Sequence, residues 1–219
     1  MNNKHVLIIL PHPDDESFAT AGTIMHYKDL GYKVTYLCLT KGEMGRNLGN
    51  PPLANRETLP KVREKELQEA AKILGIDEVI FFGLRDKTIE FHDEEDLAKR
   101  MKETIEKLMP EKIFTFYPGF SIHPDHDACG AIVCRAVEMI ENEKRPKLYA
   151  MAIAKGATKV IGKPHITYDV KKYSDRKMRA LKAHRTQMQE VAAVIEHQLK
   201  IGNKNTDEWF HYENYWVIE

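Results

Sequence analysis

Short apolar runs recur along the first part of the chain and alternate with longer segments of helical periodicity. Most of these runs are apolar on both faces, which is typical of parallel strands covered by helices on either side. They predict strands at Val6–Leu10, Lys33–Leu39, Glu78–Phe82 and Lys112–Phe116, and a fifth within Leu148–Ile153. The segments between them predict helices at Ser17–Leu30, Pro60–Leu74, Asp93–Met109 and His126–Asn142.

Glycine and proline mark the ends of several predicted helices. Gly31 and Gly75 stand where a glycine caps the carboxyl end of a helix, and Pro60 fits a first helical turn. The alternation of strands and helices predicts an α/β fold, a Rossmann-like open, mostly parallel sheet with helices on both faces. Because the chain contains no internal repeat or linker, we expect a single domain over residues 1–219.

Two segments depart from this alternation. Residues Lys41–Leu59 are rich in glycine and proline and form a loop longer than a plain connection needs, as functional loops often are. The last part of the chain predicts a strand at His165–Val170 and one long helix from Ser174 to about Lys200. An aromatic tail, Trp209–Ile218, is expected to pack back on the domain.

Composition and charge narrow the classes of partner and compartment. Lysine plus arginine and aspartate plus glutamate both number 33, so the formal net charge is zero. A nucleic acid or an anionic membrane usually requires a basic face, so we expect neither as a partner. The three cysteines are odd in number and lack metal-binding spacing, and no apolar run has the length of a membrane span or a signal-peptide core. These features favour the cytoplasm.

Acidic residues and histidines follow two of the predicted strands. The first strand leads into His12-Pro13-Asp14-Asp15-Glu16 and the fourth into His123-Pro124-Asp125-His126. Ligands of an open α/β sheet bind beyond the carboxyl ends of the strands, where the strand order reverses, so both motifs are expected at one site. An aspartate before a helix is commonly only a cap, and a lone histidine often has no role. Three histidines and three aspartates at one sheet edge nevertheless indicate function.

This set of side chains suits a divalent metal ion. A catalytic zinc typically takes three protein ligands from histidine and carboxylate and leaves a fourth position for water. The remaining residues can supply a general base, an electrophile and an orienting carboxylate, which together can hydrolyse an amide. The residues alone leave open a non-haem iron oxygenase, a Rossmann-like binding module without the G-x-G-x-x-G motif, and a metal-binding regulatory protein.

The two motifs resemble those of the LmbE-like or PIG-L deacetylases, which act on N-acetylglucosamine-containing small molecules. The resemblance extends over nearly the whole chain and includes Thr40–Glu43, Arg63–Glu66 and Lys177–Gln187. It implies that His12, Asp15 and His126 bind one Zn²⁺ per subunit, with other divalent metals as alternatives. It also implies a homo-oligomer, either a trimer or a hexamer.

The resemblance assigns further roles residue by residue. Asp14 matches the general base that activates the water, His123 the residue that polarises or protonates the tetrahedral intermediate, and Asp125 the carboxylate that holds the His123 imidazole. Arg63 matches a contact to the sugar hydroxyls. Glu16 is interpreted as structural, bonded to backbone near the start of its helix.

Within this family, the resemblance points to the bacillithiol biosynthetic branch, whose substrate is N-acetylglucosaminyl L-malate. Other N-acetylglucosamine glycosides and thiol conjugates remain open as substrates. Because malate carries two carboxylates, we expect cationic side chains beside it, and arginine pairs with carboxylates best. The candidate substrate-binding residues are Lys41, Arg46, Arg56, Arg63 and, by resemblance, His184.

Overall fold

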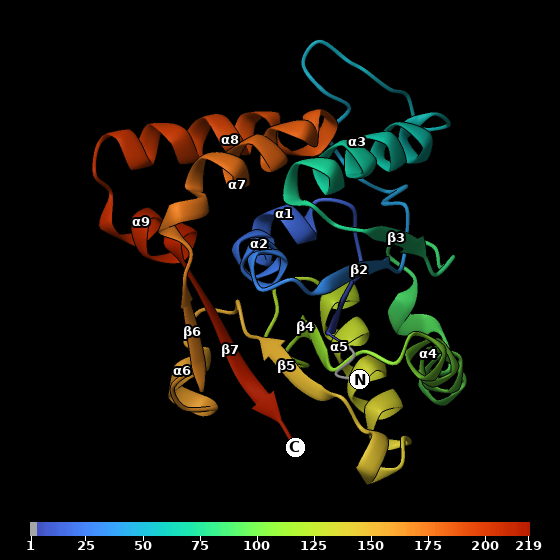
Figure 1. The fold of residues 1–219 in the computed structure, drawn as a ribbon. Coiled ribbons are helices and arrows are strands. Elements are labelled where there is room, and N and C mark those ends of the chain that lie inside the picture. Colours follow the sequence, from blue (N-terminus) through green and yellow to red (C-terminus); the bar gives the residue numbers. More distant parts are fainter. Residues whose placement is uncertain (1–3) are drawn as a thin grey trace.

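The computed structural model describes residues 4–219, which contain one seven-stranded sheet of order β3-β2-β1-β4-β5-β7-β6 (Figure 1). The first five strands of this order, from β3 through β1 to β5, pair in parallel, whereas β7 runs antiparallel to both β5 and β6. The predicted mostly parallel α/β sheet is therefore confirmed. The strands are β1 (His5–Leu10), β2 (Lys33–Cys38), β3 (Glu78–Phe81), β4 (Lys112–Phe116), β5 (Lys147–Met151), β6 (Ile166–Asp169) and β7 (Tyr212–Ile218).

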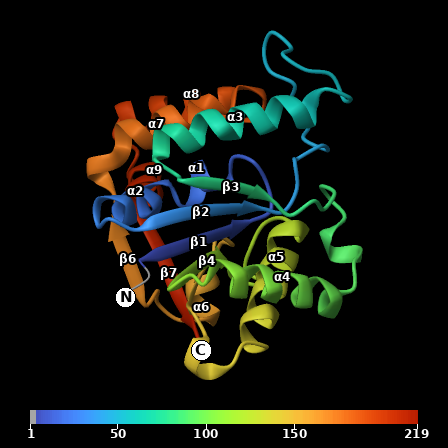
Figure 2. The ribbon, with the colours of Figure 1, turned by 45° about the vertical axis from the view of Figure 1, so that its right-hand side comes forward.

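Helices cover both faces of the sheet, as Figure 2 shows with α3 and α7 on one side and α4 and α5 on the other. The α-helices are α1 (Asp15–Ala19), α2 (Ala21–Asp29), α3 (Leu59–Leu74), α4 (Glu94–Leu108), α5 (Pro124–Glu138), α6 (Ala157–Val160), α7 (Ser174–Ala183), α8 (Arg185–Lys200) and α9 (Lys204–His211). The short 3₁₀ turns are η1 (Ile89–Phe91), η2 (Asn142–Lys144) and η3 (Lys171–Tyr173). Within residues 4–219, no helix is both long and apolar enough to cross a membrane.

Strand β1 lies at the centre of the sheet, and all of its residues are buried. Val6 and Ile8 pack into the core shared with α2, α3 and α7, whereas Leu7 and Ile9 pack into the core shared with α4 and α5. Successive side chains of a strand point to opposite faces, so a strand covered on both sides needs apolar residues at every position. This requirement explains why the strand pattern was readable from the sequence.

The helix predicted over Ser17–Leu30 is two helices, because the chain breaks at Thr20 between α1 and α2. The carboxylate of Glu213 on β7 accepts hydrogen bonds from the N–H groups of Gly22 at 2.9 Å and Thr23 at 2.7 Å. These N–H groups belong to the first turn of α2 and have no partner within the helix. The prediction was wrong because the residue that caps α2 lies 190 positions away in the sequence.

The helix predicted from Ser174 to about Lys200 is also interrupted, at His184 between α7 and α8. Glu66 on α3 accepts hydrogen bonds from the backbone N–H of Thr186 at 2.9 Å and from its hydroxyl at 2.7 Å. Again a carboxylate from a distant helix satisfies the first turn of a new helix. The break turns His184 toward the interior, where it is fully buried.

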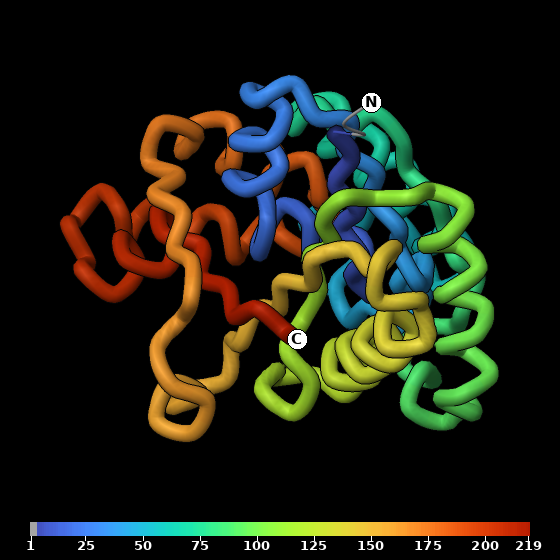
Figure 3. Tube along the Cα trace, turned by 60° about the horizontal axis from the view of Figure 1, so that its bottom comes forward, coloured from blue at the N-terminus to red at the C-terminus, as the bar shows by residue number. Residues whose placement is uncertain are grey.

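The aromatic tail packs back on the domain as predicted, as α9 followed by β7. Figure 3 shows β7, in red, beside the orange segment that contains β6. Phe210 and Tyr215 are both buried. The single domain expected over residues 1–219 includes residues 1–3, which lie outside the described part of the chain. That expectation therefore stays a prediction.

The strand order reverses between β1 and β4, which are parallel neighbours at the middle of the sheet. From β1 the chain moves outward through β2 to β3, and from β4 it moves outward in the other direction to β5. Connections that leave in opposite directions open a crevice at the carboxyl ends of the strands. Leu10 at the end of β1 and Phe116 at the end of β4 therefore deliver both sequence motifs to this crevice.

Candidate active site and metal centre

His12, Asp15 and His126 meet at the crevice. Nδ1 of His12 lies 3.5 Å from Oδ2 of Asp15, and Nε2 of His126 lies 3.3 Å from Oδ1 of the same carboxylate. Each of the three residues offers one potential ligand atom, and these three atoms all lie within 4.8 Å of one another. Folding thus brings together the three residues that were predicted as metal ligands, as two imidazoles around one carboxylate.

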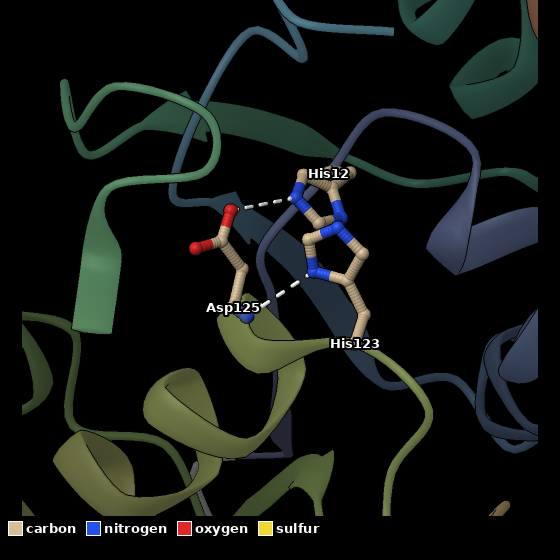
Figure 4. A group of neighbouring side chains, drawn as sticks. All are labelled: His12, His123 and Asp125. Atoms are coloured by element: carbon tan, nitrogen blue, oxygen red, sulfur yellow. Dashed lines mark hydrogen bonds and ion pairs between the residues drawn. The ribbon is translucent and has the colours of Figure 1, made fainter. Parts of the chain in front are cut away.

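The second ring nitrogen of His12 is held by carboxylates. Its Nε2 is 3.1 Å from Oδ2 of Asp125 (Figure 4). The same nitrogen is 3.2 Å from Oδ1 of Asp86. An ionised carboxylate only accepts hydrogen bonds, so Nε2 carries a proton, and in the neutral ring that a metal requires the lone pair is on Nδ1. Histidines that bind metals commonly donate their other N–H to a carboxylate in this way. This arrangement fits a divalent metal that is bound by Nδ1 of His12.

The electrostatics of the cluster also suit a cation. Burial alone would raise the pKa of the Asp15 carboxyl, but the adjacent His126 and His12 lower it. Burial alone would likewise lower the pKa of His12, yet hydrogen bonds to Asp125, Asp15 and Asp86 raise it well above its usual value. Three carboxylates surround one imidazole, so the site favours positive charge. Two imidazoles and a carboxylate are donors that zinc accepts.

Asp125 has a different partner from the one predicted. Its carboxylate accepts hydrogen bonds from His12 and from the backbone N–H groups of Lys87 at 2.7 Å and Ile89 at 3.2 Å. Toward His123, Asp125 offers only its backbone N–H, which donates to Nδ1 at 3.1 Å (Figure 4). The prediction that this carboxylate holds His123 is therefore wrong. The carboxylate points toward the first motif because α5 enters the crevice beside β1.

Asp86 is a site residue that the sequence reasoning missed. It follows β3 in a turn and is 4% exposed, and its carboxylate accepts a hydrogen bond from the Met44 N–H at 2.8 Å. Although burial opposes ionisation, the hydrogen bond from His12 lowers the pKa of Asp86 to about 2. Its only signal in the sequence is a position just after a parallel strand, at the same sheet edge as the two motifs.

His123 caps the amino end of α5 and presents its free ring nitrogen to the site. Because Nδ1 accepts the N–H of Asp125, the proton of the neutral ring resides on Nε2. Burial and then the charges of His12 and His126 lower the pKa of His123. The ring lies edge-on to His12, with the centroids 5.0 Å apart. A neutral imidazole with a free Nε2–H can donate a hydrogen bond to an oxyanion.

Asp14 adopts a backbone conformation that favours glycine, with φ 112° and ψ −28°. Such strain costs about 1–3 kcal/mol and persists only where the surroundings enforce it. Its N–H donates to Oε2 of Glu16 at 3.0 Å, which confirms the structural role expected for that glutamate. Its carboxylate accepts from Nη2 of Arg63 at 3.0 Å. Burial raises the pKa of Asp14 to about 6 against the opposing charge of Arg63.

The guanidinium of Arg63 is 4% exposed and largely committed to the protein. Nη1 donates to the carbonyl of Gly42 at 2.8 Å, while Nη2 donates to the carbonyl of Pro13 and to Asp14. Arg63 still lines the active-site cavity. It therefore orients Asp14, and its predicted contact to the sugar hydroxyls stays a prediction.

A cavity of about 550 Å³ opens over the cluster. His12, Asp14, Asp15, His123 and His126 all line it, and Phe18, Met44, Gln187 and Val191 form apolar and polar walls. Of the cationic candidates for the aglycone, Arg46 and Arg63 line this cavity. The site therefore has room for a small glycoside next to the predicted ligands and base.

The other predicted substrate contacts lie elsewhere in the described structure. Lys41 forms an ion pair with Glu64 at 2.5 Å, and Arg56 donates to the carbonyl of Gly45. His184 has no exposed surface, and its Nε2 lies 2.7 Å from Oε1 of Glu16. The structure corrects the predicted direct contact for His184, because a fully buried ring behind the site cannot reach a ligand in the cavity.

Comparison with known proteins shows the family. Residues 7–137 match the family model described as PIG-L, GlcNAc-PI de-N-acetylase. The chain belongs to this family. The resemblance recognised from the two motifs is thus confirmed, and membership favours hydrolysis over the iron-oxygenase and binding-module alternatives.

Relatives with high identity cover nearly the whole chain. A probable N-acetyl-alpha-D-glucosaminyl L-malate deacetylase 2 of Bacillus subtilis (strain 168) is 47% identical over 99% of this chain and 98% of the relative. A protein of the same name from Bacillus anthracis is 44% identical over 99% and 96%. Among solved structures, N,N'-diacetylchitobiose deacetylase from Pyrococcus horikoshii has a TM-score of 0.76 at 22% identity, covering 99% and 84% of the two chains. That last similarity supports the PIG-L fold.

Proposed function

We propose that this protein hydrolyses the acetamide of N-acetyl-α-D-glucosaminyl L-malate, the deacetylation step of bacillithiol biosynthesis. The observation that carries the proposal is the meeting of His12, Asp15 and His126 beside Asp14 and His123 in one cavity. Relatives of up to 47% identity over nearly the full chain bear the name of that activity. Membership of the PIG-L family supports the reaction class, and the relatives support the aglycone.

The proposed reaction adds water to the amide carbonyl and then breaks the C–N bond. A divalent metal, preferably Zn²⁺, held by His12, Asp15 and His126 would polarise the carbonyl and acidify the water. Asp14 takes a proton from the attacking water, since its carboxylate lines the cavity and is ionised at neutral pH. The same proton, or another from solvent, passes to the leaving amine. Acetate and the free glucosamine glycoside are the products.

His123 stabilises the negative charge that develops on the carbonyl oxygen. Its Nδ1 is occupied by the N–H of Asp125, so the ring cannot rotate without losing that bond. The remaining Nε2–H is therefore held in place as a donor. Such a donor stabilises the developing oxyanion without any cost for reorienting the ring. Arg63 contributes indirectly, because its guanidinium holds the Asp14 carboxylate at 3.0 Å.

The malate aglycone requires positive charge near the sugar site. Arg46 lies in the glycine- and proline-rich loop and lines the cavity, so we assign it to a malate carboxylate. Lys41 is paired with Glu64 and Arg56 donates to the Gly45 carbonyl, so the assignment to malate goes to Arg46 rather than to these two side chains. Arg63 also lines the cavity, but its guanidinium is committed to Gly42, Pro13 and Asp14, which leaves Arg46 as the arginine for the aglycone.

The proposal includes a homo-oligomer in the cytoplasm. Val194 on α8 is apolar and 60% exposed, which suits a contact between subunits. Cys38, Cys129 and Cys134 are free thiols in the described structure, which suits a reducing compartment. Measurement of the molar mass in solution tests the predicted trimer or hexamer, and a monomer at micromolar concentration would contradict it.

The decisive experiment measures amine release together with metal content. The substrates are N-acetylglucosaminyl L-malate, free N-acetylglucosamine, diacetylchitobiose and an inositol glycoside of N-acetylglucosamine. We expect the highest kcat/KM on the malate glycoside, loss of activity on chelation and recovery with Zn²⁺. Equal kcat/KM on the malate glycoside and the free sugar would reject the malate assignment. Activity that persists without metal would reject the metal-dependent mechanism.

A further inference from the structure

We propose that His184 and Glu16 are positioning residues, which hold the Asp14 backbone in its left-handed conformation and so direct its carboxylate. The proposal rests on the function above, in which Asp14 is the base. It assigns a catalytic consequence to a buried pair that touches neither the cavity nor the predicted metal ligands through hydrogen bonds.

Asp14 is held on both sides of its strained φ torsion, and its carbonyl also accepts the N–H groups of Ser17 at 3.1 Å and Phe18 at 3.0 Å at the start of α1. Its N–H donates to Oε2 of Glu16 at 3.0 Å, and its carboxylate accepts from Arg63 at 3.0 Å. The first bond fixes the peptide plane that precedes Asp14, while the second fixes the side chain that follows the torsion. An L-residue with φ 112° relaxes toward negative φ when one of these contacts is lost.

Glu16 is the centre of this arrangement and is completely buried. Its two oxygens have separate tasks: Oε2 accepts from the Asp14 N–H, while Oε1 accepts from Nε2 of His184 at 2.7 Å and from the Ser17 hydroxyl. A buried carboxylate is stable only when hydrogen-bond donors surround it. The orientation of Oε2 toward Asp14 therefore depends on the donors that hold Oε1.

His184 is the only long-range donor to Glu16 among the hydrogen bonds of residues 4–219, and it comes from 168 positions away. It lies at the break between α7 and α8, which Glu66 stabilises by bonding Thr186. Its other nitrogen, Nδ1, is buried and has no hydrogen-bond partner within the described chain. The ring therefore contributes one polar contact, and that contact is to the carboxylate that holds the base.

The experiment compares three variants, two at position 184 and one control at position 5. His184→Leu keeps a buried apolar volume but removes the donor, whereas His184→Gln places an amide N–H near the former Nε2. His5→Leu is the matched control, since His5 is 3% exposed and its Nε2 bonds Thr35 at 2.9 Å, outside the active site. All are assayed with the malate glycoside at measured metal content and folded fraction.

We expect His184→Leu to lower kcat on the order of 10²-fold with KM and metal content unchanged, because small misplacements of a catalytic group have effects of that size. His184→Gln should restore most of the loss, and His5→Leu should lower the melting temperature while leaving kcat at the wild-type value. A crystal structure of His184→Leu should show Asp14 outside the left-handed region. Wild-type kcat in His184→Leu, or Asp14 still at positive φ, would overturn the proposal.

A thermodynamic cycle tests the same link without any activity. At position 14, Ala and Gly both lack the carboxylate and its Arg63 contact, so the difference in melting temperature between Asp14→Ala and Asp14→Gly reports the backbone conformation alone. Glycine relieves the strain where the chain still holds position 14 at positive φ, and gives no relief where that position has relaxed. The advantage of Asp14→Gly over Asp14→Ala should therefore be larger in the wild-type background than in His184→Leu, by about 2–4 °C. An equal advantage in the two backgrounds would reject the positioning role even if the wild type proved inactive on every acetamide.

Discussion

Nε2 of His12 donates a hydrogen bond to Oδ2 of Asp125, 3.1 Å away and 113 positions later in the chain. This bond joins the two sequence motifs across β1 and β4. It also decides which nitrogen of His12 faces Asp15, because the proton on Nε2 leaves Nδ1 as the electron-pair donor. The first prediction follows from this bond.

Asp125→Asn should weaken metal binding about 10–100-fold, the usual effect of removing a carboxylate that orients a ligand histidine. Titration with Zn²⁺ against a competing chelator measures the change. Asp127→Asn is the matched control on the same helix, since within residues 4–219 that carboxylate accepts only a loop N–H, from Ser121. Unchanged metal affinity with reduced turnover in Asp125→Asn would instead indicate that this residue acts through His123.

Alanine at His12, Asp15 or His126 should remove most of the bound metal, because three protein ligands are needed for a stable catalytic site. Metal analysis of the purified variants provides the measurement. His92→Ala, at an exposed position in the turn after η1, is the control and should keep full occupancy. Full occupancy in all three ligand variants would show that the ion is bound elsewhere.

Asp14→Asn should retain the metal and the contact to Arg63, since its amide oxygen still accepts a hydrogen bond. Turnover should nevertheless fall roughly 10²–10⁴-fold, because the amide cannot take the proton of water. Single-turnover kinetics on the malate glycoside measure this effect, and Asp29→Asn on the surface of α2 is the control. An asparagine variant with wild-type turnover would mean that another group is the base.

His123→Ala should lower turnover on the order of 10²–10³-fold, which is the usual contribution of one oxyanion donor. Since His123 caps α5 through the Asp125 N–H, its loss can also destabilise the helix, so the melting temperature is measured in parallel. His123→Asn supplies an alternative cap acceptor and separates the two effects. Turnover that returns fully in His123→Asn would assign the residue to capping alone.

Arg46→Ala should raise KM for the malate glycoside far more than for free N-acetylglucosamine, because Arg46 lines the cavity and the free sugar lacks the two carboxylates. Arg56→Ala is the matched control from the same loop, because the Arg56 guanidinium donates to the Gly45 carbonyl instead. Steady-state kinetics on both substrates give the comparison. Equal increases in KM for the two substrates would place Arg46 at the sugar.

Lys177→Met should destabilise the fold by about 3–5 kcal/mol, because it leaves the carboxylate of Glu213 buried without its cation. The two side chains are 1% and 2% exposed and their charged atoms lie 2.8 Å apart. Lys182→Met on the same helix removes an exposed ion pair with Glu196 and should cost about 1 kcal/mol or less. Urea unfolding of both variants measures the difference, and similar losses would contradict this account.

The sequence by itself was sufficient to predict the parallel core and the two motifs that meet at the crevice. Strands such as Val6–Leu10 are apolar at every position because helices cover both faces, and that pattern is local. His12 and His126 were identifiable because each follows a parallel strand, and such strands share one carboxyl edge. The strands were predictable from their local apolar pattern. The meeting of the two motifs was predictable because the carboxyl ends of parallel strands share one edge of the sheet.

Only the tertiary structure decided the partners of the polar side chains. The carboxylate of Asp125 could have faced His123 or His12, and the packing of α5 against β1 selects His12. The break at His184 depends on Glu66, which reaches Thr186 from α3, and Glu16, which bonds the left-handed Asp14, is itself bonded by His184 from 168 positions away. A hydrogen bond between distant segments leaves no periodic trace in either one, because its energy depends on distance and orientation after folding.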